Sequence, residues 1–248
     1  ASSNGFLAKT ARFVGKAAHA GVAPEQGINA LNAATLALTA INAQRETFRD
    51  QDCVRVHPNL TKAGDIVNIV PAEVKMETYV RARTTAAMLD AAAKVDRALK
   101  GAAIASGCTV EVETVPGYLP LNNDAKLADM FRATVEQLFG ADAYHELPHS
   151  GGATDAGDLS QMMPVLHPHM TGARGIVHGK DWHIADRDDG YIAPAKTLAM
   201  MAVELLADDA AKAREVLAGF QPAMSKQEYL EQQQDIFRTD VYDGAGLA

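Results

Sequence analysis

The stretch GKAAHAGVAPEQGINAL, residues 15–31, decides the fold because it joins two segments of different periodicity. Polar and apolar side chains alternate through residues 9–16, which indicates a strand. Apolar side chains recur at three- and four-residue steps through residues 25–43, which predicts an amphipathic helix. Glycine and proline interrupt the chain between the two segments. They place His19 on a turn, where a side chain can face a ligand.

The next part of the chain repeats this change of periodicity. Strands are predicted at residues 52–57, 74–83 and 109–115, and a second amphipathic helix at 88–102 is closed by Gly107. The order strand, helix, strand, strand, helix, strand is that of a ferredoxin-like β-α-β-β-α-β domain. Such a sheet carries both helices on one face. Its other face and one edge stay free, which suits a dimer contact.

The pattern changes after Pro116-Gly117. Asp124 precedes a helix of about fifteen residues, and further helices are predicted near 155–162, at 191–206 and at 207–220. These elements, with short apolar runs between them, are typical of the returning half of a doubly wound α/β domain. The sequence therefore predicts three segments: a lid or dimerisation domain at 9–117, the C-terminal part of an α/β domain at 118–220, and a polar tail at 221–248.

The composition excludes several classes of protein. The 248 residues carry a net charge of −8, whereas a nucleic-acid partner requires a basic face. No apolar run reaches the roughly 18 residues of a membrane span. Cys53 and Cys108 fall in predicted strands and have no metal-binding spacing, so we interpret them as free buried thiols of a cytoplasmic protein. A disulfide between them stays open at this point.

The segment around His19 resembles the start of the lid, or dimerisation, domain in the aminoacylase/carboxypeptidase family of dinuclear zinc hydrolases. It is most similar to the amidohydrolase subgroup that includes aminobenzoyl-glutamate hydrolase, and the resemblance extends over about residues 9–206. It implies cleavage of an amide next to a free carboxylate, in an N-acyl amino acid, an aminobenzoyl-glutamate-like compound or a dipeptide. It also implies a homodimer through the lid, in which His19 hydrogen-bonds the oxyanion in the neighbouring subunit.

Three further motifs resemble segments that bind substrate in this family. Asn68, in the loop before Pro71, is similar to the family's Asn-x-x-Pro loop, although a plain polar turn explains the same residues. Arg81 stands where the family has an arginine that binds the substrate carboxylate, a role that suits a planar bidentate donor. Arg83 would face the same side of the strand. The third motif resembles the family's Gly-x-Thr-Asp turn, and its candidate residues are Gly151, Gly152, Thr154 and Asp155.

The last motif concerns metal binding. His178 precedes Trp182 by four positions, as in the family's final ligand segment, so His178 is the expected zinc ligand and His183 the alternative. The family implies two divalent ions per site, with zinc, manganese or cobalt as candidates. The remaining ligands and the glutamate base are expected in a segment before Ala1. Less favoured ligands are His145, His149, His167 and His169.

Two other interpretations remain at this stage. The chain begins at Ala1 within the lid strand, so it is expected to be a fragment, or a protein whose front half is supplied separately. A catalytically incomplete fragment would act only as a dimerising or binding module. A regulatory protein that keeps the fold without its chemistry is a further alternative, against which the presence of His19, Arg81 and His178 argues.

Overall fold

The computed structural model describes residues 2–247, which divide into two compact units. The first, here called the sheet unit, comprises Ser3–Pro120, Ser150–Gly157 and the segment from Ser225 onward. The second, here called the helical unit, comprises Leu121–His149 and Asp158–Met224.

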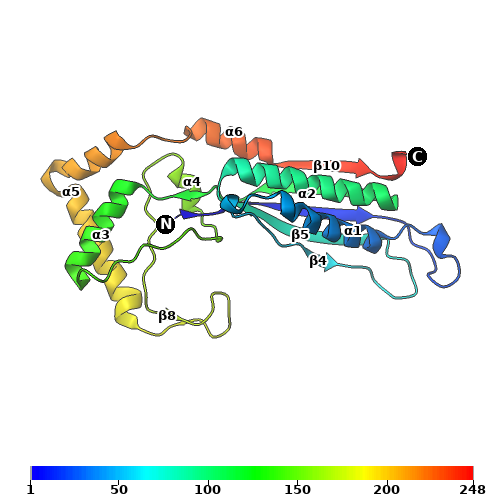
Figure 1. The fold of residues 1–248 in the computed structure, drawn as a ribbon, viewed down its shortest axis with the longest axis horizontal. Helices are drawn as coiled ribbons and strands as arrows, with labels where there is room; N and C mark the ends of the chain where they lie inside the picture. Colours follow the sequence, from blue (N-terminus) through cyan, green and yellow to red (C-terminus); the bar gives the residue numbers. More distant parts are fainter. Residues whose placement is uncertain (1, 248) are drawn as a thin grey trace. The chain divides into compact units, whose positions relative to one another are not determined.

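The sheet unit contains an antiparallel sheet covered by two helices (Figure 1). Its strands are β2 (Gly5–Val14), β3 (Arg55–Val56), β4 (Asn59–Lys62), β5 (Glu73–Ala82), β6 (Thr109–Pro116) and β10 (Arg238–Asp243). They are arranged in the order β10-β6-β2-β5-β3, and β4 also pairs with β5. The helices are α1 (Ala30–Ala43) and α2 (Thr85–Ser106), which pack on each other and on β2 and β5. The predicted ferredoxin-like order is therefore confirmed.

Alternation along β2 explains why one sheet face is buried. Leu7, Lys9, Ala11 and Phe13 are at most 2% exposed, whereas the residues that alternate with them are partly exposed. The helices present mainly alanines to this face, and these small side chains let α1 and α2 lie close to each other and to the strands. The core of the unit lies between this face of the sheet and the two helices.

The start of α1 differs from the predicted helix at 25–43. Residues Pro24–Gln26 form a separate 3₁₀ turn, and the side chain of Asn29 accepts hydrogen bonds from the backbone of Leu31 and Asn32. Asn29 is therefore the N-cap, and the helix begins at Ala30. The end of α2 agrees with prediction, because Gly107 adopts φ 70° in the left-handed region that ends helices.

The second predicted strand, at 52–57, is shorter in the structure. Residues Asp50–Asp52 form a 3₁₀ turn that ends at Cys53 with φ 48°, so only Arg55–Val56 remain extended in β3. Cys53 is thus in a turn and not in a strand, and Cys108 lies immediately before β6. Both thiols are free, as predicted, but only Cys108 is buried, and Cys53 in its turn is partly exposed. Strand β4 was not predicted from the sequence.

The segment predicted as a polar tail, 221–248, contains regular structure. Helix α6 (Lys226–Ile236) begins with a capping box, in which Ser225 and Glu228 exchange side-chain and backbone hydrogen bonds. Strand β10 then pairs antiparallel with β6, from Arg238 opposite Thr114 to Asp243 opposite Thr109. The C-terminal segment therefore extends the sheet at the β6 edge.

The helical unit has little sheet structure of its own. Its helices are α3 (Ala125–Phe139) and α5 (Ala193–Gly219), and the short strands are β7 (Leu121–Asn122), β8 (Ala173–Arg174) and β9 (His183–Ile184). The other short elements are β1 (Ser2–Ser3), α4 (Ala156–Ser160), 3₁₀ turns at Gln44–Thr47 and Ala245–Leu247, and a π-helical turn at Asp188–Ile192. Helix α5 is broken at 207–210, where the backbone leaves the helical region, which matches the two helices predicted there. No helix within the described residues has the length and apolar character needed to cross a bilayer.

Candidate functional site

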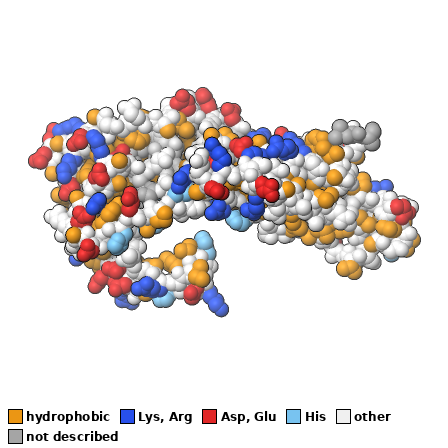
Figure 2. Space-filling model, viewed as in Figure 1, with side chains coloured by type: hydrophobic (Ala, Val, Ile, Leu, Met, Phe, Trp, Pro, Cys, Tyr) orange, Lys and Arg blue, Asp and Glu red, His pale blue; other side chains and the backbone are white. Residues whose placement is uncertain are grey.

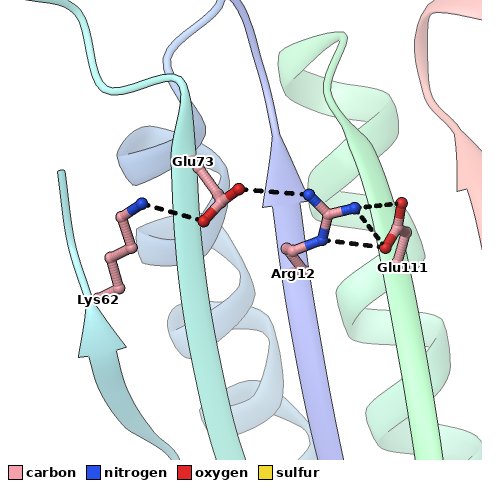
Figure 3. Close-up of polar contacts among 4 residues, drawn as sticks. All are labelled: Arg12, Lys62, Glu73 and Glu111. Atoms are coloured by element: carbon pink, nitrogen blue, oxygen red, sulfur yellow. Dashed lines mark hydrogen bonds and ion pairs between the residues drawn. The ribbon is translucent and has the colours of Figure 1, made fainter.

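The sheet face opposite α1 and α2, here called the open face, carries a row of ion pairs at one end (Figure 3). Lys62 Nζ lies 3.0 Å from Glu73, and Arg12 lies 3.3 Å from Glu73 and 2.7 Å from Glu111. Hydrogen bonding to Glu111 is the main cause that raises the pKa of Arg12, and the hydrogen bond from Lys62 is the main cause that lowers the pKa of Glu73. Every charge in this row is therefore balanced by another protein residue.

Aromatic side chains occupy the other end of the open face. The ring centroid of Phe6 lies 4.6 Å from that of Tyr79 and 5.2 Å from that of Tyr118. Gly117 lies under this group, because a Cβ atom there would approach the Phe6 ring to 2.5 Å. We call Phe6, Tyr79 and Tyr118 the aromatic cluster. It was not predicted, since its members come from three separate parts of the chain.

Arg81 is held on the aromatic cluster. Its Cζ atom lies 5.3 Å from the Tyr79 centroid and 5.5 Å from the Phe6 centroid, which is within the range of cation–π attraction. The rings orient the guanidinium while its N–H groups remain available. Arg83, the alternative considered from sequence, lies beyond the end of β5 and is exposed. Of the two arginines, Arg81 has the geometry of a fixed anion-binding group.

His19 and Asn68 are brought together by two paired loops. Ala20 N donates to Asn68 O over 2.9 Å, and Val70 N donates to Ala18 O over 2.9 Å. Gly21 N donates to His19 Nδ1 over 3.2 Å. In the neutral imidazole the proton is therefore on Nε2, which is free to donate a hydrogen bond to a ligand. Within residues 2–247 the side-chain amide of Asn68 makes no hydrogen bond, so it is also available.

The same two loops expose several apolar side chains. Val67 is 100% exposed and Val22 is 78% exposed, and Ile66 and Ile69 are also largely accessible. Exposed apolar groups of this kind, placed around polar side chains, are typical of surfaces that become covered by another part of an assembly.

The turn at Gly151–Asp155 is accessible but has ordinary backbone geometry. Neither Gly151 nor Gly152 has a positive φ, and a Cβ atom at Gly151 would contact nothing within 4 Å. The backbone conformation of this turn therefore does not require glycine at either position. Gly152 N donates to Ser150 Oγ over 3.1 Å, and Thr154 Oγ1 donates to Asp155 over 3.2 Å. The open space beside the glycines permits close approach of a ligand.

The two metal candidates lie near the β8–β9 hairpin of the helical unit. His178 is exposed and has φ 66°, in a turn where Gly179 N donates to Ile176 O. His183 Nδ1 lies 2.8 Å from Asp181 O, which orients the ring and leaves Nε2 for a ligand. No group of three potential metal-ligating residues occurs within the described part of the chain. Each imidazole fits one zinc position, but a zinc site requires three or four ligands.

The helical unit also contains a cavity of about 360 Å³. It is mostly apolar, and His145, His167 and His169 are among its lining residues. None of the residues predicted as catalytic or substrate-binding lines it. His149 is not among the lining residues either.

Known proteins resemble most of this chain in sequence. Residues 2–107 match the family described as peptidase dimerisation domain. Mouse Xaa-Arg dipeptidase is 29% identical over 206 residues, covering 79% of this chain and 47% of that protein. One of the subunits of p-aminobenzoyl-glutamate hydrolase from Escherichia coli K12 is 28% identical over 209 residues, covering 83% of this chain and 47% of that protein. The chain thus spans about half the length of these relatives.

Solved structures share the fold. The aminobenzoyl-glutamate utilization protein from Klebsiella pneumoniae superposes with a TM-score of 0.59 at 20% identity, over 81% of this chain and 48% of that one. Aminopeptidase PepT from Bacillus cereus superposes with a TM-score of 0.62 at 22% identity, over 81% of this chain and 52% of that one.

Proposed function

We propose that the full-length protein is a metal-dependent amidohydrolase, because residues 2–107 match the family described as peptidase dimerisation domain. Its substrate is an amide next to a free carboxylate: an N-acyl amino acid, an aminobenzoyl-glutamate-like compound or a dipeptide. Homology to a dipeptidase and to p-aminobenzoyl-glutamate hydrolase supports this class of reaction. The single observation that carries the proposal is the backbone pairing of the loops that bear His19 and Asn68, with Nδ1 of His19 bound by Gly21 N.

His19 acts as the oxyanion donor. Attack of water on the scissile carbonyl places negative charge on the carbonyl oxygen, and a fixed N–H donor stabilises that charge more than it stabilises the ground state. The hydrogen bond from Gly21 keeps Nδ1 as the acceptor, so Nε2 carries the proton that the oxyanion needs. Asn68, from the paired loop, adds a second polar contact to the substrate.

Arg81 binds the substrate carboxylate. A guanidinium donates two parallel hydrogen bonds to a carboxylate, and the aromatic cluster restricts the orientation in which Arg81 does so. The accessible turn at Gly151, Gly152, Thr154 and Asp155 lies in the same unit and offers hydroxyl and backbone groups for positioning. These residues bind the substrate carboxylate, whereas the metal site and His19 act in the chemical step.

His178 supplies one metal ligand, with His183 as the alternative. A pair of divalent ions, zinc with manganese or cobalt as alternatives, would polarise the scissile carbonyl and lower the pKa of the hydrolytic water. The other ligands and a glutamate base would be contributed by a part of the protein outside this chain, since residues 2–247 hold no three-ligand group. The same observation favours a second candidate function, in which this chain alone is a dimerising or binding module.

The assembly is a homodimer through the sheet unit. The outward residues of α1 are uncharged: Asn32, Thr35, Leu36, Thr39 and Asn42. Figure 2 shows mainly apolar and uncharged atoms over this region. A solvent-facing helix normally carries charges, whereas the centre of an interface lacks them. In a two-fold dimer the His19 loops, with their exposed Val22 and Val67, reach the partner's site. The two free cysteines suit a cytoplasmic location.

The test is hydrolysis by the full-length protein. It should release the free amino acid from N-acyl amino acids when loaded with zinc, manganese or cobalt, and lose this activity in a chelator. The chain of residues 1–248 alone should bind no metal tightly and have no turnover. Absence of hydrolysis by the metal-loaded full-length protein, with a dimer still formed, would favour the binding-module alternative.

A further inference from the structure

Two arginines oppose each other on the open face. Arg55 of β3 is the direct antiparallel partner of Arg81 of β5, and Phe6 of β2 is the partner of Arg81 on the other side. Val56, the next residue, is 2% exposed in the core, so Arg55 points to the open face as Arg81 does. Within residues 2–247, neither guanidinium has an acidic partner.

The remaining cations on the open face are all paired. Arg12 lies 2.7 Å from Glu111, Lys62 lies 3.0 Å from Glu73, and Lys75 lies 2.6 Å from Glu77. Like charges directly opposite each other destabilise a sheet. Within residues 2–247, this sheet face therefore pairs its cations with carboxylates at one end and has two cations without an acidic partner at the other. An anion bound between Arg55 and Arg81 would remove this repulsion.

The donors of the two arginines suit two carboxylates. Arg81 is held by the aromatic cluster with its N–H groups free. Arg55 uses Nη1 for a 3.0 Å hydrogen bond to the carbonyl oxygen of Val54, which leaves other N–H groups of the fork available. Side chains directly opposite on neighbouring strands are about 5 Å apart at Cβ. The two carboxylates of an aspartate or glutamate residue are likewise separated by a short carbon chain.

We propose that Arg55 is a specificity-determining residue that binds a second carboxylate, so that the preferred substrate releases an amino acid of the aspartate or glutamate class. This proposal rests on the amidohydrolase function proposed above. A substrate that releases arginine would place a third guanidinium next to those of Arg55 and Arg81, which have no acidic partner within residues 2–247. The pair of Arg55 and Arg81 therefore disfavours substrates whose leaving amino acid is basic.

The test compares N-acetyl-glutamate with N-acetyl-glutamine on the full-length metal-loaded protein. The acid should have a kcat/KM roughly 10- to 100-fold higher, the size expected for a hydrogen bond to a charged group. Arg55→Gln should reduce this preference to within about 3-fold, mainly by lowering kcat/KM for the acid, and Arg55→Lys should retain part of it. The matched control is Arg49→Gln. Arg49 is exposed and already paired with Asp52 at 2.9 Å, so the preference should persist.

The outcomes separate this proposal from the one it rests on. If both substrates are cleaved equally well by the unmodified protein and by Arg55→Gln, the second carboxylate site is wrong while the amidohydrolase function stands. If neither substrate is cleaved, the amidohydrolase function itself is wrong. If Arg55→Gln weakens the dimer in sedimentation and leaves the substrate preference unchanged, the anion belongs to a second copy of the chain and the proposal is overturned.

Discussion

Lys9 and Asp96 form a buried ion pair between β2 and α2, with Nζ and Oδ1 2.7 Å apart and the two side chains 1% and 11% exposed. Burial is the main cause that lowers the pKa of Lys9, and Asp96 opposes that effect. Asp96→Ala leaves the buried Lys9 without a counter-ion. We expect the free energy of unfolding, measured with urea, to fall by about 3–5 kcal/mol.

A matched pair of variants tests the cause of that loss. The double variant Lys9→Met with Asp96→Leu removes both charges and should recover most of the stability. Arg238 also contacts Asp96, at 3.0 Å, but its side chain is 41% exposed, so Arg238→Ala should cost about 1 kcal/mol or less. A double variant as unstable as Asp96→Ala would show that the loss comes from packing and not from the unpaired charge.

The capping box of α6 predicts an acid-sensitive helix. Hydrogen bonds from the backbone and side chain of Ser225 lower the pKa of Glu228. A lowered folded-state pKa means that the contribution is present above the unfolded value of about 4.3 and is lost as pH falls through the folded value. The protection factors of the α6 amides, which compare the measured exchange rate with the intrinsic rate at each pH, should therefore fall as the pH falls through that window. Glu228→Gln keeps a neutral cap and should remove this pH dependence. An unchanged profile in Glu228→Gln would contradict the assignment.

The main sheet order could be predicted because its strands and helices show different periodicities. In β6, buried Val110 and Val112 alternate with accessible residues, and in α2 the buried alanines recur with helical spacing. Strand β10 could not be predicted in the same way. Its residues are mostly polar and accessible, as in many edge strands, and its partner β6 lies far earlier in the chain.

The residues of the candidate site likewise differ in whether the sequence alone could predict them. His19, Asn68 and Arg81 stand in local motifs, so each could be proposed from sequence. Arg55 and the aromatic cluster have no local signature, because their significance comes from strand register: Arg55 meets Arg81 only when β3 and β5 are paired. The pairing of the His19 and Asn68 loops could not be predicted either, because it depends on backbone hydrogen bonds between segments far apart in the sequence.

Loss of His19 should reduce the rate of the chemical step. In the full-length protein, His19→Ala should lower kcat by about 10²–10³-fold, as for other single oxyanion donors, with little change in KM or metal content. His19→Gln places an amide N–H near the former Nε2 position and should retain more activity than His19→Asn. Equal losses in all three variants would argue against donation from Nε2.

The homodimer predicts complementation between subunits. If His19 serves the partner's site, a mixture of His19→Ala and His178→Ala proteins should recover part of the activity, because each heterodimer contains one site with both residues intact. Sedimentation of the full-length protein should show a dimer at micromolar concentration. A monomer at that concentration, or no recovery after subunit exchange, would rule out the shared site.

His178 and His183 make opposite predictions for metal content. His178→Ala should abolish tight metal binding by the full-length protein, and His183→Ala should leave it intact. The hydrogen bond between His183 Nδ1 and Asp181 O makes this comparison informative, since it also prepares the His183 ring for a ligand. Metal analysis after dialysis gives the result. Binding that survives His178→Ala and disappears in His183→Ala would transfer the ligand role to His183.

Arg81 should determine whether the enzyme distinguishes a substrate with a free carboxylate from its carboxamide. The full-length protein should cleave an N-acyl amino acid far better than the corresponding carboxamide, because removal of one partner from a charge-assisted contact costs about 2–5 kcal/mol. This corresponds to a roughly 30- to 5,000-fold difference in kcat/KM. Arg81→Ala should lose most of the discrimination, since the carboxylate then has no partner there, whereas the exposed Arg83→Ala should keep it. Measurement of kcat/KM for both substrates on all three proteins decides the question. Equal rates for acid and carboxamide on the unmodified protein would mean that Arg81 and its aromatic cluster do not recognise a carboxylate.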